Sequence, residues 1–320
     1  MLKKMSIRKI SVATLALFTL GLLYLIPGNE EVEYALSNDD IEYIYTNTMS
    51  TIYLLDSNNY VARTVMRGCD CGPKAEAEHI IEGLIIGEAK SNDIPNGFRS
   101  IIPSGTEVLN LSLENKILTI NFSKELLDIN EDYEEKMIES IVYTLTSIDG
   151  IDKVVIQVEG ETLEKLPNSN KSLPASMDKS YGINKTYDIV NTNNIDSYTV
   201  YYVSMYNDNT YYVPVTKYVN SDGDDKVKVI IDELSSSPIH EDNLMSYLNA
   251  NTSLIDYSLE DDVLKLNFNN SIFSDNNSNK ILEEVIYTIS LSIEDNYNVK
   301  EVDFLVDNQE IYKNDLKSLE

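Results

Sequence analysis

The chain contains LENKILTINFS at residues 113–123 and a related segment, LEDDVLKLNFNN, at residues 259–270. In the first copy Leu118, Ile120 and Phe122 alternate with polar residues, which predicts a strand with one buried face. Leucines alternate in the same way on the other side of a polar turn. The segment therefore predicts a β-hairpin, and its recurrence at an offset of 146 residues predicts a second hairpin of the same kind.

Other segments recur at nearly the same offset, which indicates that a whole domain is duplicated. The pairs are Thr51–Tyr53 with Thr199–Tyr201 at offset 148, Ile141–Thr144 with Val285–Thr288 at offset 144, and Val154–Val158 with Val302–Val306 at offset 148. Insertions and deletions in loops explain why the offset drifts. We predict one domain at residues 51–162 and a second at residues 198–312.

Each copy has the same predicted order of elements. Two extended segments are followed by a helix, the hairpin, a second helix and a last strand. The second helix has apolar residues with the spacing of a single helix face. These residues are Met137, Ile138, Ile141, Val142 and Leu145, matched by Ile281, Leu282, Val285, Ile286 and Ile289. The fold class is therefore α+β, with a small sheet and two helices packed on one face in each copy.

The N-terminal segment at residues 1–27 predicts export. Four basic residues and no acidic ones accompany an apolar run from Ile10 to Ile26. This pattern is typical of a single-pass membrane anchor with the following domains outside the cytoplasm, or of a signal peptide, whose cleavage would release a secreted protein. Residues 28–50 are predicted to form a polar stalk, residues 163–197 a linker, and residues 313–320 a charged tail.

Acidic residues dominate the composition. The chain has 53 Asp and Glu against 25 Lys and Arg, a net charge of −28, and without residues 1–27 the net charge is −32. Such a charge excludes general binding to a nucleic-acid backbone. With two Cys and two His, a multi-ligand zinc site and a disulfide-stapled scaffold are also excluded.

The most unusual local motif is Cys69-Asp70-Cys71, which precedes the first predicted helix. Together with His79, the two thiols suggest a redox or metal site, because a helix N-terminus lowers a thiol pKa. The alternative is a pair of loop thiols with no further role, either free or joined in a local disulfide. The second copy has no corresponding cysteines, so the fold does not require them.

No sequence motif identifies catalytic residues. The acidic turn at residues 222–225 departs from the spacing of calcium loops, and His240 stands alone in a predicted loop. We therefore predict no catalytic, cofactor-binding or metal-binding residues.

Tyrosines gather at the start of the second copy. They are Tyr198, Tyr201, Tyr202, Tyr206, Tyr211 and Tyr212. Tyrosine is common on half-buried strands, but it is also enriched at protein interfaces. A row of exposed tyrosines on a strand would serve subunit packing, which makes Tyr201, Tyr202, Tyr206, Tyr211 and Tyr212 candidate interface residues.

The sequence IIPSGT at residues 101–106, the hairpin ending in Asn121-Phe122-Ser123, and Tyr143-Thr144-Leu145 on a helix together resemble the GerMN domain family of sporulation and germination proteins. The second copy is more divergent, with Asn249 and Asn251 in place of Pro103 and Gly105. The family commonly carries a lipidated cysteine, which this chain lacks; its first cysteine is Cys69.

The resemblance implies a fold similar to ring-building motifs. It also implies a non-enzymatic protein between the two membranes around the forespore, associated with a channel linking mother cell and forespore. Expected partners are further copies of the chain or other forespore membrane channel proteins, without a cofactor. The alternatives are an extracytoplasmic hydrolase acting on peptidoglycan and a cell-wall-binding module.

Overall fold

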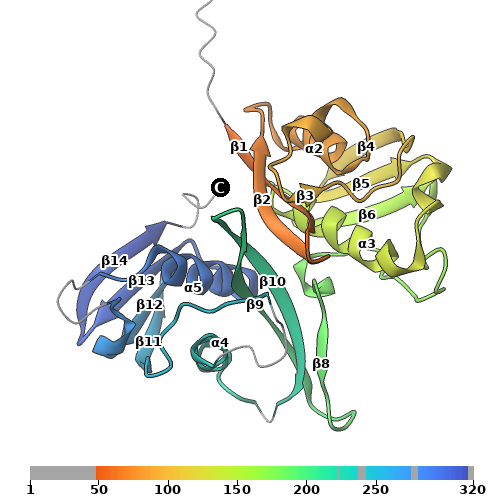
Figure 1. Ribbon diagram of the computed structural model, residues 1–320. Coiled ribbons are helices and arrows are strands. Elements are labelled where there is room, and N and C mark those ends of the chain that lie inside the picture. Colours follow the sequence, from red (N-terminus) through yellow and green to blue (C-terminus); the bar gives the residue numbers. More distant parts are fainter. Residues whose placement is uncertain (1–47, 222, 237–242, 275–279, 316–320) are drawn as a thin grey trace, which may run out of the picture. The chain divides into compact units, whose positions relative to one another are not determined.

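The computed structural model describes residues 48–221, 223–236, 243–274 and 280–315 (Figure 1). The predicted anchor at residues 1–27, nearly all of the stalk and His240 lie outside these ranges. Within these ranges no helix is long and apolar enough to cross a membrane.

The first domain follows the predicted order of elements and adds short ones. Its elements are β1 (Met49–Asp56), β2 (Val61–Arg67), α2 (Pro73–Leu84), a 3-10 helix (Ala89–Asp93), β3 (Phe98–Arg99), β4 (Val108–Glu114), β5 (Ile117–Phe122), a 3-10 helix (Lys124–Leu127), α3 (Glu131–Thr146), β6 (Lys153–Val158) and β7 (Glu161–Thr162).

The second domain repeats this order after a connecting segment. The connection contains a 3-10 helix (Lys179–Tyr181) and β8 (Thr186–Asp188). The domain then consists of β9 (Ile195–Tyr206), β10 (Asn209–Asn220), α4 (Lys226–Ser235), β11 (Leu254–Glu260), β12 (Val263–Phe268), a 3-10 helix (Asn270–Ile272), α5 (Glu283–Asn296), β13 (Glu301–Val306) and β14 (Gln309–Asp315). The predicted α+β class and the duplication are both confirmed.

Each predicted hairpin is the start of a four-stranded sheet. The strand orders are β4-β5-β6-β7 and β11-β12-β13-β14. Both hairpin turns have two successive residues with positive φ, Asn115 and Lys116 in the first and Asp261 and Asp262 in the second. A two-residue turn with positive φ at both positions matches the twist of the two strands that it joins. Leu118, Ile120 and Phe122, which the alternation assigned to the core, are fully buried.

The first two strands of each domain leave these sheets and build a third one together. The order is β3-β1-β2-β10-β8, with β9 on the other side of β10 (Figure 1). The two domains meet where Tyr212 of β10 pairs with Arg63 of β2. One sheet thus continues from one domain into the next.

Helix α3 has a second sheet on its other side, which adds to the predicted arrangement of a small sheet with helices on one face. Helix α3 contacts β1 and β2 on one side and β6 on the other. All residues from Met137 to Leu145 are buried. A helix that is buried all round needs a cover on both sides, and the sheet that contains β6 supplies the second cover.

The match between the second helices at offset 144 is wrong by about one helical turn. The Tyr53 backbone N–H donates to Thr144 Oγ1 at 3.0 Å, and the equivalent Tyr201 N–H donates to Ser292 Oγ at 2.9 Å. Thr144 therefore corresponds to Ser292, at offset 148. A shift of four residues almost preserves the apolar stripe of a helix, so the pattern alone did not distinguish the two alignments.

The predicted linker at residues 163–197 is partly buried rather than fully exposed to solvent. Its apolar residues Leu166, Leu173, Met177 and Ile183 are buried. They are spaced irregularly, so no periodic pattern predicted that these side chains are buried. The segment also contributes β8, which pairs with β10.

Candidate functional site

The junction between the domains contains a chain of buried polar groups. The hydroxyls of Tyr53 and Tyr201, equivalent residues of the two copies, are 2.8 Å apart. Tyr201 donates to Asp295 Oδ2 at 2.7 Å. Since Tyr201 has one hydroxyl proton, Tyr53 must be the donor in the bond between the tyrosines. The phenol of one domain thus donates to the phenol of the other.

A lysine from the connecting segment completes this chain. Lys179 Nζ lies 2.6 Å from Asp295 Oδ1, and the Asp295 side chain is only 2% exposed. The Tyr143 hydroxyl donates to the Lys179 carbonyl at 2.9 Å. Burial, with the nearby charge of Asp295, raises the pKa of Tyr53, so its phenol stays protonated. The junction therefore joins both domains and the segment between them.

The expected row of exposed tyrosines is wrong for three of the five candidates. Tyr201, Tyr202 and Tyr211 are buried, while Tyr206 and Tyr212 are half-buried. Helices α4 and α5 pack on β9 and cover that strand. Tyr211 donates to Asp56 Oδ2 of the first domain at 2.8 Å. Tyr201 and Tyr211 thus do form an interface, but within the chain.

Asn184 closes a gap in the shared sheet. Its side-chain amide donates to the carbonyls of Val61 and Pro214, both at 2.8 Å, and its oxygen accepts from the Val61 N–H at 3.0 Å. Proline has no backbone N–H, so Pro214 cannot pair with Val61 directly. Asn184 supplies the missing donor between β2 and β10.

We expect Asn184→Ala to lower the free energy of unfolding by about 2 kcal/mol, because three hydrogen bonds at a partly buried site are lost. The control is Asn170→Ala. Asn170 also has positive φ but lies exposed and bridges no strands. Urea unfolding of both variants measures the difference, and equal losses would contradict the bridging role.

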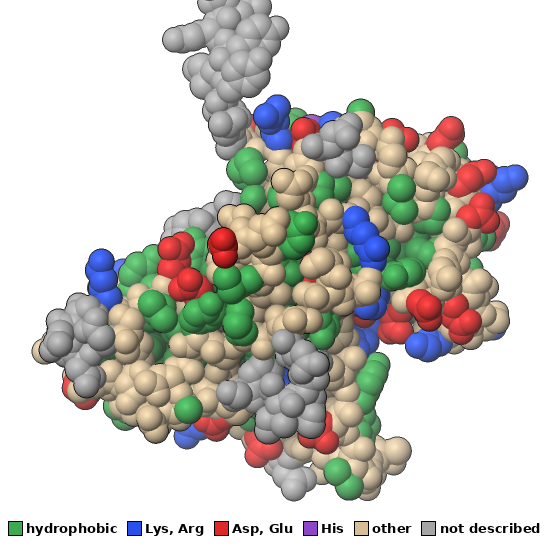
Figure 2. Space-filling view, viewed as in Figure 1, with side chains coloured by type: hydrophobic (Ala, Val, Ile, Leu, Met, Phe, Trp, Pro, Cys, Tyr) green, Lys and Arg blue, Asp and Glu red, His purple; other side chains and the backbone are tan. Residues whose placement is uncertain are grey.

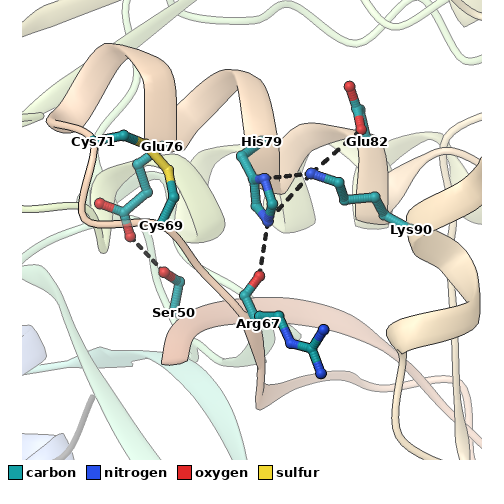
Figure 3. Close-up of a disulfide and its surroundings, with 8 residues drawn as sticks. All are labelled: Ser50, Arg67, Cys69, Cys71, Glu76, His79, Glu82 and Lys90. Atoms are coloured by element: carbon teal, nitrogen blue, oxygen red, sulfur yellow. Dashed lines mark hydrogen bonds and ion pairs between the residues drawn. A yellow bond between two sulfur atoms is a disulfide. The ribbon is translucent and has the colours of Figure 1, made fainter. Parts of the chain in front are cut away.

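Cys69 and Cys71 form a disulfide just before α2, with their Cα atoms 5.3 Å apart (Figure 3). The disulfide lies beside Glu76, which accepts a hydrogen bond from Ser50 at 2.5 Å. His79 is turned instead toward Lys90 and the Arg67 carbonyl, the latter at 2.9 Å. The residues of a thiol–imidazole site are therefore present but not brought together.

Reducing this disulfide is expected to change stability little. It closes a loop with one intervening residue, and so short a loop corresponds to about 1–2 kcal/mol of chain entropy. Thermal unfolding with and without reductant measures this effect, and a Cys69→Ser, Cys71→Ser double variant is the control for incomplete reduction. A loss of more than about 3 kcal/mol on reduction would contradict this entropic account.

A cluster of ionisable groups that no sequence motif indicated lies beside α3. Lys185 Nζ lies 2.8 Å from Glu135 Oε1 and 3.5 Å from Glu139 Oε1. Burial raises the pKa of the Glu139 carboxyl to about 7, although Lys185 opposes the shift. Hydrogen bonds and the charges of Lys185 and Lys171 lower the pKa of Glu135, despite the opposing effect of burial. The sequence did contain one indication of this cluster: Glu139 is an acidic residue among the apolar residues of α3.

This cluster lines an open cavity of about 490 Å³ between α3 and the segment at residues 184–187. Five acidic residues and three lysines line the cavity, so charges of both signs face it and acids are in excess. Elsewhere, Asp225 of the acidic turn caps α4 and accepts from the Val227 N–H at 3.1 Å. No group of three or more His, Cys, Asp or Glu residues in the described ranges is arranged to hold a metal ion.

The model of the Germane family, described as sporulation and spore germination, matches residues 51–164 and 199–312. The chain belongs to the Germane family. These two matches coincide closely with the two domains of the structure. The Germane domains thus account for most of the described chain.

Two comparisons relate this Germane protein to named relatives. It is 30% identical over 264 residues to the spore germination protein GerM of Bacillus subtilis (strain 168), covering 80% of this chain and 71% of that protein. It also matches the solved tandem GerMN domains of the sporulation protein GerM from Bacillus subtilis, with a TM-score of 0.75 and 29% identity over 82% of this chain and 92% of that chain. Homology to GerM makes it a protein of sporulation or germination.

Proposed function

We propose that this protein is a non-enzymatic component of the spore envelope that acts through protein–protein contacts. The observation that carries this proposal is the shared sheet with its buried junction. Two Germane domains joined by paired strands and a buried Tyr53–Tyr201–Asp295 chain present a preformed surface. A preformed surface loses little conformational freedom when a partner binds.

The proposed location follows from the N-terminal segment. Lys3, Lys4, Arg8 and Lys9 precede or flank the apolar run and favour a cytoplasmic start. The strongly acidic domains would then lie outside the cytoplasm, in the space between forespore and mother-cell membranes. There the protein would take part in the channel linking the two cells, as one subunit of a ring or beside other channel proteins.

Deleting the gene in its host tests the role. We expect defective spore formation or germination with normal vegetative growth. Protease added outside protoplasts of vegetative cells that express the protein should degrade the domains of the membrane-bound protein. Normal spores, or domains protected by the cell membrane, would contradict the proposal.

A second experiment tests the non-enzymatic part of the proposal. The full chain is incubated with purified spore cortex, and released fragments are measured. We expect no release. Fragments that disappear after substitution of a single carboxylate residue would replace our proposal with a peptidoglycan hydrolase.

A further inference from the structure

Strand β11 exposes a row of apolar side chains at the end of a sheet. It is the outermost strand of the order β11-β12-β13-β14 (Figure 1). Ile255, Tyr257 and Leu259 are 51%, 38% and 55% exposed; Tyr257 and Leu259 lie in the regular part of the strand and Ile255 at a bulge between Leu254 and Asp256. An edge strand with exposed apolar residues tends to pair with a strand of another molecule.

The first domain covers part of the corresponding row. Leu109, Leu111 and Leu113 of β4 occupy the equivalent positions at offset 146. Leu111 is only 4% exposed and Leu113 is half-buried, whereas Leu109 is 47% exposed. Helix α2, which is 12 residues long, contacts β4, whereas α4 has 10 residues and packs on α5 and β9. The second domain thus leaves exposed an apolar row that the first domain partly covers.

We propose that β11 pairs antiparallel with β11 of a second copy of this chain, with Tyr257 opposite Tyr257. The two-residue turn places Glu260 opposite Val263 in the hydrogen-bonded position of the hairpin. Backbone groups alternate in direction along a strand, so those of Tyr257 and Leu259 point away from β12. These groups can pair with a second strand, as in β-strand addition.

The distribution of acids favours this register over the two adjacent ones. With Tyr257 at the centre, Asp256 lies opposite Ser258 and Glu260 opposite the bulged segment at residues 254–255, so no acid faces an acid. A shift of two residues in one direction puts Asp256 opposite Asp256, and in the other direction Asp256 opposite Glu260. Like charges directly opposite are destabilising. In a chain with a net charge of −28, a self-pairing surface needs such an arrangement.

Pairing also covers the apolar row. The Tyr257 hydroxyl donates to Asp225 Oδ1, at the start of α4, at 3.1 Å, so the row lies on the helix-covered side of the sheet. Two-fold pairing brings the rows of both copies together on that side. The face in Figure 2 shows acidic and hydrophobic side chains interspersed over both domains. Apolar surfaces that associate must therefore avoid bringing the neighbouring acidic side chains of the two copies together. The pairing rests on the proposed role in protein contacts and names a second copy as one partner.

Cysteine cross-linking of the full chain in mild detergent tests the register. The Asp256→Cys and Ser258→Cys variants are mixed and oxidised. Residues directly opposite have Cβ atoms about 5 Å apart, whereas diagonal neighbours are about 7–8 Å apart. We therefore expect disulfide-linked dimers in the mixture, at least tenfold more than with either variant alone. The matched control is Asn110→Cys mixed with Ser112→Cys, the equivalent pair on β4, which should not cross-link.

Several outcomes would overturn the proposal: no dimer in the mixture, equal cross-linking by one variant alone, or equal cross-linking by the β4 pair. Leu259→Lys provides an independent variant, because this side chain is exposed and its replacement should preserve the fold. Sedimentation should show at least tenfold weaker self-association than the parent, while Leu109→Lys leaves it unchanged. A parent that is monomeric at all concentrations would refute self-pairing without affecting the gene-deletion test of function.

Discussion

Replacing Asp295 with alanine is expected to lower the free energy of unfolding by about 3–5 kcal/mol, the usual effect of removing one partner of a buried ion pair. The substitution leaves the Lys179 ammonium, whose side chain is 23% exposed, without its partner at 2.6 Å. It also removes the acceptor of the Tyr201 hydroxyl. Because these groups join both domains, the loss should appear in urea unfolding of the whole described unit.

Two variants isolate the buried charge. Asp295→Asn keeps an acceptor for Tyr201 and removes only the charge, so we expect a smaller loss. Asp152→Ala breaks the exposed pair with Lys116, whose side chains are 61% and 63% exposed, and should cost less than about 1 kcal/mol. If Asp295→Ala costs no more than Asp152→Ala, the junction is not stabilised by this pair.

Replacing Glu139 with glutamine is expected to remove a pH dependence of stability. The pKa of this carboxyl is raised from 4.5 to about 7 in the folded chain. The folded state therefore binds the proton more tightly than the unfolded state, and its stabilising effect is present below pH 4.5 and is lost as pH rises through 7. The shift corresponds to about 3 kcal/mol. Relative to the variant, the parent should lose about that amount between pH 4.5 and 8.

Glutamine preserves the local contacts, because it can accept from the Asn184 N–H, which lies 3.0 Å from Glu139 Oε2. Lys185 retains its pair with Glu135. The matched control is Glu135→Gln, for which the sign is opposite. The pKa of Glu135 is lowered, so its stabilising effect is present above pH 4.5 and lost as pH falls. A difference between parent and Glu139→Gln that does not vary with pH would contradict the raised pKa.

Most local elements of this fold were predictable from the chain. Alternation in Leu118, Ile120 and Phe122 depends only on the strand period of two, and these side chains are buried as expected. Recurrence at a near-constant offset identified the duplication without any knowledge of contacts. The family assignment rested on the same segments and is confirmed by the match at residues 51–164 and 199–312.

The candidate site was less predictable. Tyr201 was identified as an interface residue, but its partner, Tyr53, was not, and neither was the role of Asp295. Asn184 lay in a segment without periodicity, yet it joins β2 to β10. These residues act through contacts across long sequence separations. No local pattern encodes such contacts.

Spacing, recurrence and composition along the chain were enough to predict most strands and helices, the duplication of the domain and the strongly acidic body of the protein. Contacts in the folded protein established three further features: the two domains share one sheet, Tyr201 faces Tyr53, and β11 leaves apolar side chains exposed. Those outcomes depend on which surfaces meet in space, and a period of two or 3.6 residues specifies a face without specifying what covers it.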